Sequence, residues 1–217
     1  MFHNRAEAGQ RLARALSHYA DLPDGLVLAI PRGGVVVGLA LSQGLRLPLD
    51  ILITRKIGAP GNPELALAAL TETGFLYLNK DLLTLYPSLA AAVQPQQSHQ
   101  EEEIARRQAQ YRGGRGLSPL AGRTVLLVDD GVATGSTFLA SIAALRASHV
   151  AHLIAALPVA PPATAQKIAA QVDESVVLES PESFMAVGES YEDFTQVEDD
   201  EVIRCLAQGW HPSLNSS

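Results

Sequence analysis

Short apolar runs alternate with amphipathic segments along this chain of 217 residues. Residues 125–128 are four consecutive apolar side chains, a pattern typical of a strand buried on both faces of a sheet. Leu12, Leu16 and Tyr19 recur at helical spacing, which predicts an amphipathic helix over residues 5–19. Further strands are predicted at residues 26–30, 49–54, 75–78, 153–157 and 176–178, and further helices at residues 35–41, 81–93 and 98–111.

The alternation of strands and helices predicts an α/β fold, in which a mainly parallel central sheet is flanked by helices. No internal repeat or low-complexity linker divides the sequence, so a single domain is expected over residues 1–208. Its core would span about residues 20–179 and a small cap residues 180–208. Residues 209–217 are predicted to form a frayed tail.

Composition narrows the possible classes of protein. The hydrophobic content of 47% and the charged content of 18% are typical of a globular protein. A net charge of −7 argues against a general nucleic-acid surface, and the single Cys205 excludes an intrachain disulfide. No apolar run approaches the ~20 residues that cross a bilayer, and the N-terminus lacks the apolar region of a signal peptide. We therefore expect a cytoplasmic protein with neither a membrane nor a nucleic-acid partner.

The segment that follows the apolar run at residues 125–128 combines acids with a small, hydroxyl-rich loop. Asp129 and Asp130 would lie at the carboxyl end of the strand, where open α/β sheets bind ligands. The loop at residues 134–137 offers backbone N–H groups, hydroxyls and the start of a helix, which together suit a phosphate. A hairpin turn and simple helix caps would explain parts of this segment, but not their order. The order favours a ligand with both a vicinal diol and a phosphate.

This segment resembles the 5-phosphoribosyl-1-pyrophosphate (PRPP) signature of the type I phosphoribosyltransferases. The match runs position by position through Asp129, Asp130, Ala133, Thr134, Gly135, Ser136 and Thr137, and the core likeness spans about residues 26–159. The resemblance implies that the two acids bind the ribose 2- and 3-hydroxyls and that the loop, with Gly131 and Val132, wraps the 5-phosphate. It also implies a Mg²⁺ cofactor near the acids, held indirectly, and a small hood formed by terminal segments.

Two further segments are candidate sites for a polyanion. Gly33 and Gly34 follow the strand at residues 26–30 and allow a close approach by a ligand, while Arg32 supplies a permanent cation. In the family this place is taken by a pyrophosphate-binding loop, although a plain strand-to-helix turn would have a similar sequence. Arg55 and Lys56 precede a stretch rich in Gly and Pro, which predicts an irregular loop at residues 53–64. By resemblance this loop is mobile and catalytic; otherwise it is a surface turn.

The acceptor region is the least defined part of the sequence. Phe184, Tyr191 or Phe194 would stack on a base if the likeness to 6-oxopurine enzymes extends to residues 181–194, or would be core residues of the cap. Ala133 stands where those enzymes usually carry an acid, and residues 152–159 lack the Lys with which they read the purine oxygen. The sequence therefore does not identify the acceptor. The charge run at residues 101–107 is predicted to be a solvated helix face.

The predicted activity is Mg²⁺-dependent transfer of ribose 5-phosphate from PRPP to a nitrogenous base or related amine. The catalytic residues would be Asp129, Asp130, Arg55 and Lys56. A regulatory protein that senses PRPP or a nucleotide would use the same phosphate site, and a nucleoside-phosphate hydrolase would need a general base that is not evident. The chain's partners would be PRPP, a small acceptor and a second copy in a homodimer.

Overall fold

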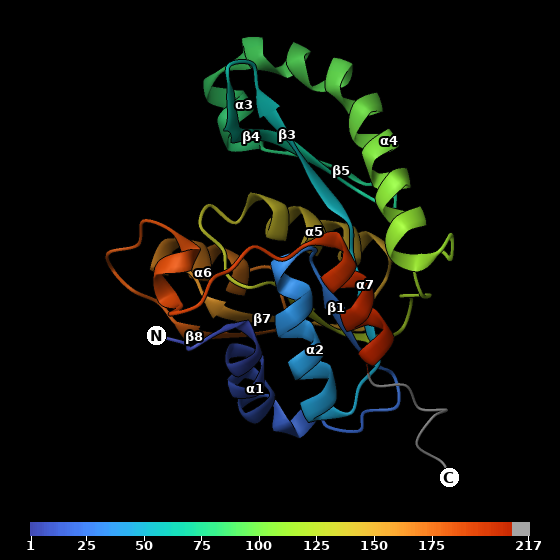
Figure 1. Cartoon of the computed structure of the whole chain (residues 1–217). Coiled ribbons are helices and arrows are strands. Elements are labelled where there is room, and N and C mark those ends of the chain that lie inside the picture. Colours follow the sequence, from blue (N-terminus) through green and yellow to red (C-terminus); the bar gives the residue numbers. More distant parts are fainter. Residues whose placement is uncertain (210–217) are drawn as a thin grey trace.

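The computed structural model describes residues 1–209, except for the side chains of residues 63 and 64, and contains two sheets. The larger sheet is parallel, with the order β2-β1-β6-β7-β8 (Figure 1). Its strands are β1 (Gly25–Ala29), β2 (Leu49–Ile51), β6 (Thr124–Val128), β7 (His152–Val159) and β8 (Glu174–Glu179). The predicted α/β fold with a mainly parallel central sheet is confirmed. The predicted tail lies outside the described residues, apart from Gly209.

Helices cover both faces of this sheet, because alternate residues of each buried strand point to opposite sides. Leu126 and Val128 of β6 pack in one apolar cluster with helices α1 (Arg5–Ala15) and α2 (Gly33–Leu45). Val125 and Leu127 pack in a second cluster on the other face, with α5 (Ser136–Ala147) and α6 (Pro162–Ala169). Strand β6 is buried along its whole length, as its sequence predicts.

The first residues of the chain lie beside a later segment around Tyr191, next to the sheet. Phe2 pairs with Tyr191, just after the short helix η3 (Val187–Ser190), and its amide donates to the Ser190 carbonyl at 2.7 Å. Helix α7 (Asp199–Gln208) then packs against α2. The terminal segments therefore form a small hood next to the core.

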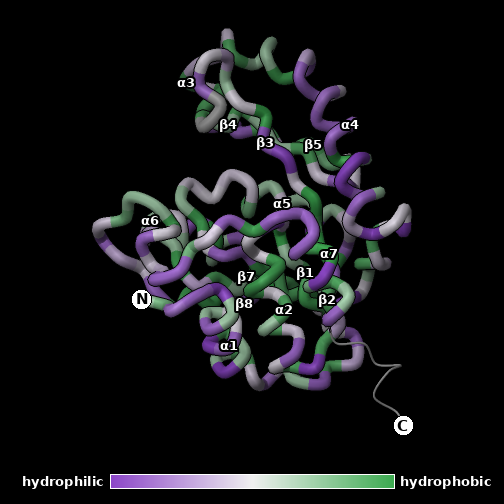
Figure 2. Tube along the Cα trace, viewed as in Figure 1, coloured by the Kyte–Doolittle hydropathy of each residue, from purple (hydrophilic) through white to green (hydrophobic). Residues whose placement is uncertain are grey.

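Residues 54–112 form a second unit, which we call the arm. It projects from the core in Figure 1 and holds the antiparallel sheet of β3 (Thr54–Ala59), β4 (Asn62–Thr71) and β5 (Leu76–Leu78). Its helices are α3 (Lys80–Leu85), η2 (Pro87–Ala92) and α4 (Val93–Arg112). Figure 2 shows that hydrophobic positions concentrate around the parallel strands, whereas much of α4 is hydrophilic.

The arm corrects three expectations. The strand predicted at residues 49–54 ends at Ile51, and the irregular loop predicted at residues 53–64 is a β-hairpin with Arg55 and Lys56 inside β3. The glycines have specific places in this hairpin: Gly61 takes the positive φ of the turn, and Gly58 lies at a register shift. The helix predicted at residues 81–93 is divided into α3 and η2 before Pro87, and α4 begins at Val93.

Within residues 1–209, no helix combines the length and the apolar character that crossing a bilayer would require.

Candidate active site

The acid pair lies against the glycine loop because β1 and β6 are neighbouring parallel strands. Ala29 pairs with Val128, so both strands end at the same edge of the sheet. A Cβ atom on Gly33 would lie 1.9 Å from Asp130 Oδ2, and one on Gly34 would lie 2.8 Å from Asp129 Cα. Both glycines are therefore packed closely against the acids, and the predicted close approach of a ligand at this loop stays a prediction.

The two carboxyl groups lie close together in a partly buried position. Burial raises the pKa of Asp129 well above its usual range, and the neighbouring charge of Asp130 raises it further. Burial also raises the pKa of Asp130, while the charge of Arg5 opposes that shift. The pair therefore favours the approach of a cation or of hydrogen-bond donors.

Arg5, which no sequence motif indicates, binds Asp130. Its Nε donates to Asp130 Oδ2 at 2.7 Å, and its Nη1 donates to the Thr195 carbonyl at 2.8 Å. The guanidinium lies 3.8 Å from the centre of the Phe194 ring, and Arg5 is only 8% exposed. The hood thus holds Asp130 in place, and no local pattern could have indicated a contact across 125 positions.

The predicted phosphate loop borders a cavity of about 230 Å³ at the start of α5. Gly135 has a φ of 76° and precedes the first helical residue, Ser136. Thr164 Oγ1 donates to the Ala133 carbonyl at 2.8 Å, which fixes the loop from α6. The lining residues are Lys56, Asp129, Gly131, Val132, Ala133, Thr134, Gly135, Ser136, Thr137 and Phe138.

A second cavity, of about 490 Å³, lies between the core and the arm. Arg55 Nε donates to Gln100 Oε1 at 3.0 Å. Burial lowers the pKa of Arg55, and the charge of Arg107 lowers it further. The wall consists of Ile30, Pro31, Thr54, Arg55, Lys56, Gly58, Ala59, Gln96, Gln100, Arg107, Asp129 and Thr137. Lys56, Asp129 and Thr137 border both cavities.

Arg32 lies beside α7 in this structure. Its Nη1 is 3.6 Å from Glu198 Oε2 and 3.7 Å from Asp199 Oδ1. Arg32 lines neither of the two cavities that Asp129 borders, although Pro31 lines the larger one. The glycine loop thus follows β1, as the sequence predicts, but the Arg32 guanidinium lies beside two acids of the hood.

The aromatic residues predicted to stack on a base occupy other positions. Tyr191 is 6% exposed, its ring packs against Phe2 and Phe194, and its hydroxyl donates to the Asp130 carbonyl at 2.5 Å. This packing leaves no ring face of Tyr191 for a base. Phe184 lines a separate cavity of about 210 Å³. The alternative, that these aromatics are core residues of the cap, fits the buried Tyr191, whereas Phe194 packs on Tyr191 and Arg5 but is 36% exposed.

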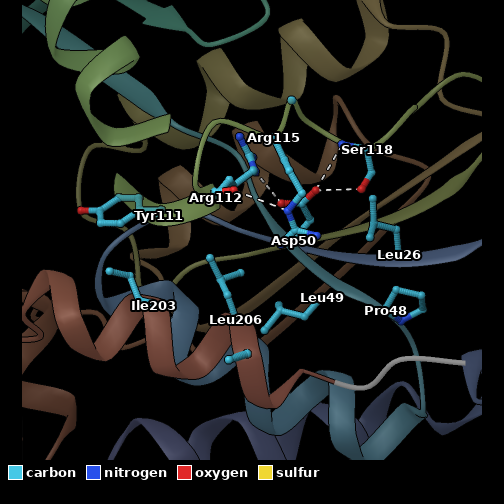
Figure 3. Close-up of a pocket in the computed structure, with 12 residues that line it drawn as sticks. Leu26, Pro48, Leu49, Asp50, Tyr111, Arg112, Arg115, Ser118, Ile203 and Leu206 are labelled. Atoms are coloured by element: carbon cyan, nitrogen blue, oxygen red, sulfur yellow. Dashed lines mark hydrogen bonds and ion pairs between the residues drawn. The ribbon is translucent and has the colours of Figure 1, made fainter. Parts of the chain in front are cut away.

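A larger cavity of about 540 Å³, near the start of β1, has its main polar groups already paired (Figure 3). Arg112 Nε donates to Asp50 Oδ1 at 2.8 Å, and Ser118 Oγ donates to Asp50 Oδ2 at 2.8 Å. Arg112 also forms an ion pair with Glu72. This network joins the end of α4 to β2, and we interpret it as structural.

Glu103 on α4 makes the free energy of unfolding depend on pH in the acid range. A hydrogen bond from Arg106, aided by Arg107, lowers the pKa of Glu103 from 4.5 to about 2. Because the folded-state value is the lower one, this stabilisation is present above pH 4.5 and is lost as the pH falls towards 2. We expect Glu103→Gln to be less stable than the wild type at pH 7, with a gap that narrows at pH 3. Urea unfolding at both pH values measures the gap, and a constant gap would contradict the expectation.

Comparisons with known proteins identify relatives over nearly the whole chain. Residues 2–192 match the family model described as a phosphoribosyl transferase domain. A Mycobacterium tuberculosis protein that is provisionally named a phosphoribosyl transferase is 39% identical to this chain over 206 residues. These residues are 95% of this chain and 46% of that protein. The chain therefore spans about half the length of this curated relative. The crystal structure of TT1426 from Thermus thermophilus is 37% identical, with a TM-score of 0.82, and the match covers 97% of this chain and 99% of that one.

Proposed function

The chain belongs to the phosphoribosyl transferase family, and on that premise we propose that it transfers ribose 5-phosphate from PRPP to a nitrogen nucleophile, releasing pyrophosphate. The observation that supports this most directly is the pair of adjoining cavities that share Asp129, Lys56 and Thr137. One cavity has the amide- and hydroxyl-rich loop that suits a phosphate, and the other has a cationic wall that suits pyrophosphate. A ribose between them would meet Asp129.

The proposed reaction breaks the bond between the anomeric carbon and the pyrophosphate oxygen, and the electron pair leaves with pyrophosphate. A bond forms from the acceptor nitrogen to the same carbon, and the nitrogen then loses its proton to solvent or to a base that is not assigned. Positive charge develops on the ribose during this exchange, and Asp129 would stabilise it electrostatically. Arg55 and Lys56 would stabilise the leaving group.

The residues present fit a Mg²⁺ ion of the kind this reaction uses. Asp129 offers carboxylate oxygens, which suit Mg²⁺, in a position where burial and like charge favour a cation. Within the described residues, no group of three or more His, Cys, Asp or Glu side chains is placed to hold a metal ion. Substrate oxygens would therefore complete the coordination of Mg²⁺. The ion would neutralise charge on the leaving group.

A PRPP sensor without transferase activity is the second candidate. It is favoured by the positions of the aromatics, because Tyr191 is packed in the hood and Phe184 lines a separate cavity. Incubation of the protein with PRPP, Mg²⁺ and a panel of purines, pyrimidines and other amines distinguishes the two. Pyrophosphate release with one acceptor would support the transferase. PRPP binding without release would support the sensor.

Asp129→Asn is expected to weaken PRPP binding while raising stability. The variant loses the carboxylate charge that would face the ribose, and charge-assisted hydrogen bonds of this kind are worth about 10–100-fold in affinity. It also relieves the repulsion from Asp130, while an amide oxygen can still accept from the Asp130 amide. Calorimetric titration with PRPP and Mg²⁺ measures the first effect and thermal unfolding the second.

The matched control is Asp81→Asn, an exposed carboxylate of the arm that lines neither cavity. It should change neither quantity. Asp130 is a poor choice for this test, because its removal would leave the buried guanidinium of Arg5 without its carboxylate partner. Unchanged PRPP affinity in Asp129→Asn would contradict the proposed site.

A further inference from the structure

Helix α4 presents two adjacent arginines to different surroundings. Arg106 has a side chain that is 53% exposed, whereas the side chain of Arg107 is 18% exposed and lines the cavity between core and arm. The sequence predicts only a solvated face for the charge run at residues 101–107. The structure corrects that expectation for Arg107, because α4 packs against β3 and β4 and so turns this residue inward.

The cavity wall that contains Arg107 has more positive than negative charge. Arg106 and Arg107 both bind one carboxylate, Glu103, through Nε atoms at 2.7 Å. Arg55, on the neighbouring strand, has a neutral amide as its partner and is close enough to Arg107 for the two charges to interact unfavourably. Three guanidiniums thus share one acid. An anion with several negative oxygens would relieve this repulsion.

The opposite side of the same cavity is formed by Pro31 and Asp129, which belong to the glycine loop and the acid pair. Arg32, the cation expected to bind pyrophosphate from that loop, is instead beside Glu198 and Asp199. The cations that line the cavity therefore come from the arm: Arg55, Lys56 and Arg107.

We propose that Arg107 of α4, together with Arg55, binds the pyrophosphate group of the donor across the cavity from Asp129. This inference rests on the proposed function and extends it, because it makes the arm one wall of the donor site. Arg107 would then be a binding residue in contact with the leaving group, while the 5-phosphate would lie in the other cavity, at the phosphate loop, which Arg107 does not line.

The test compares Arg107→Gln with Arg106→Gln, which is a matched control because it also removes one guanidinium from Glu103. Titration calorimetry would use two probes in the presence of Mg²⁺, inorganic pyrophosphate and ribose 5-phosphate. We expect Arg107→Gln to weaken pyrophosphate binding about 10–100-fold and to leave the affinity for ribose 5-phosphate within about twofold. Arg106→Gln should change neither affinity, and Arg107→Lys should recover part of the loss.

The outcomes separate this inference from the proposed function. If wild-type protein binds PRPP and both glutamine variants weaken pyrophosphate binding equally, or neither does, the assignment of Arg107 is wrong and the proposed function stands. If the wild-type protein binds neither PRPP nor ribose 5-phosphate, the proposed function itself fails. Thermal unfolding checks the fold of both variants. Arg106→Gln loses two hydrogen bonds to Glu103 and Arg107→Gln loses one, so a lower midpoint for Arg107→Gln than for Arg106→Gln would point to a structural role.

Discussion

Gly33→Ala is expected to abolish PRPP binding and to lower the free energy of unfolding by about 3 kcal/mol. The added methyl would lie 1.9 Å from Asp130 Oδ2 and 2.9 Å from Arg5 Nε. Neither group can retreat easily, because the Arg5 guanidinium is buried against Phe194 and anchored to the Thr195 carbonyl. The acid pair would have to move or lose its partner. Calorimetric titration with PRPP and Mg²⁺, together with urea unfolding, measures both effects.

Gly116→Ala is the control for this substitution. Gly116 does not require a positive φ, and a Cβ atom there would have nothing within 4 Å. Its replacement should leave PRPP affinity and stability nearly unchanged. If Gly33→Ala retained its affinity for PRPP within about twofold, the contact between the glycine loop and the acids would not be needed for binding.

Arg112→Met is expected to cost about 3–5 kcal/mol of stability, the range for removing one partner from a buried ion pair. The Arg112 side chain is 5% exposed, and its partner Glu72 is 1% exposed. Besides Asp50 and Glu72, it donates to the Ile51 carbonyl at the end of β2. The variant would leave two carboxylates without their cation. Urea unfolding at pH 7 measures the loss.

Arg115→Met tests whether this cost depends on burial. Arg115 follows three residues later, is exposed, and lines the same 540 Å³ cavity. A surface change of this kind should stay within about 0.5 kcal/mol. A loss for Arg112→Met no larger than this would mean that the Arg112 network contributes little. Glu72 lies at the base of the arm, so the Arg112→Met variant should also hold the arm less firmly against the core.

Local sequence patterns predict those parts of the fold that depend on neighbouring residues. The apolar run of β6, the two acids and the loop up to Thr137 follow one another along the chain, so their spatial order follows from their sequence order. The prediction for residues 53–64 of the arm is wrong, because Gly and Pro occur in the turns and bulges of a hairpin as well as in irregular loops. Pairing with β4, which decides between the two, is not visible in so short a segment.

Arg5 and Arg112, which no local pattern indicates as important, have distant partners. Arg5 meets Asp130 across 125 positions, and Arg112 meets Asp50 across 62. Arg107 has the spacing of an ordinary solvated pair with Glu103, and only the packing of α4 on the hairpin turns it towards Asp129. Such contacts depend on the topology of the whole fold, and a single sequence contains no periodic signal for them.

The contact between Arg5 and the hood residues around Phe194 has a consequence for folding during synthesis. Arg5 is synthesised long before Phe194 and Thr195, whose ring and carbonyl hold its guanidinium. A nascent chain that has emerged only as far as β8 would already contain the phosphate loop and both aspartates. It would lack Phe194 and Thr195, which hold Arg5 against Asp130. The donor site should therefore reach its final geometry only after residue 195 has left the ribosome.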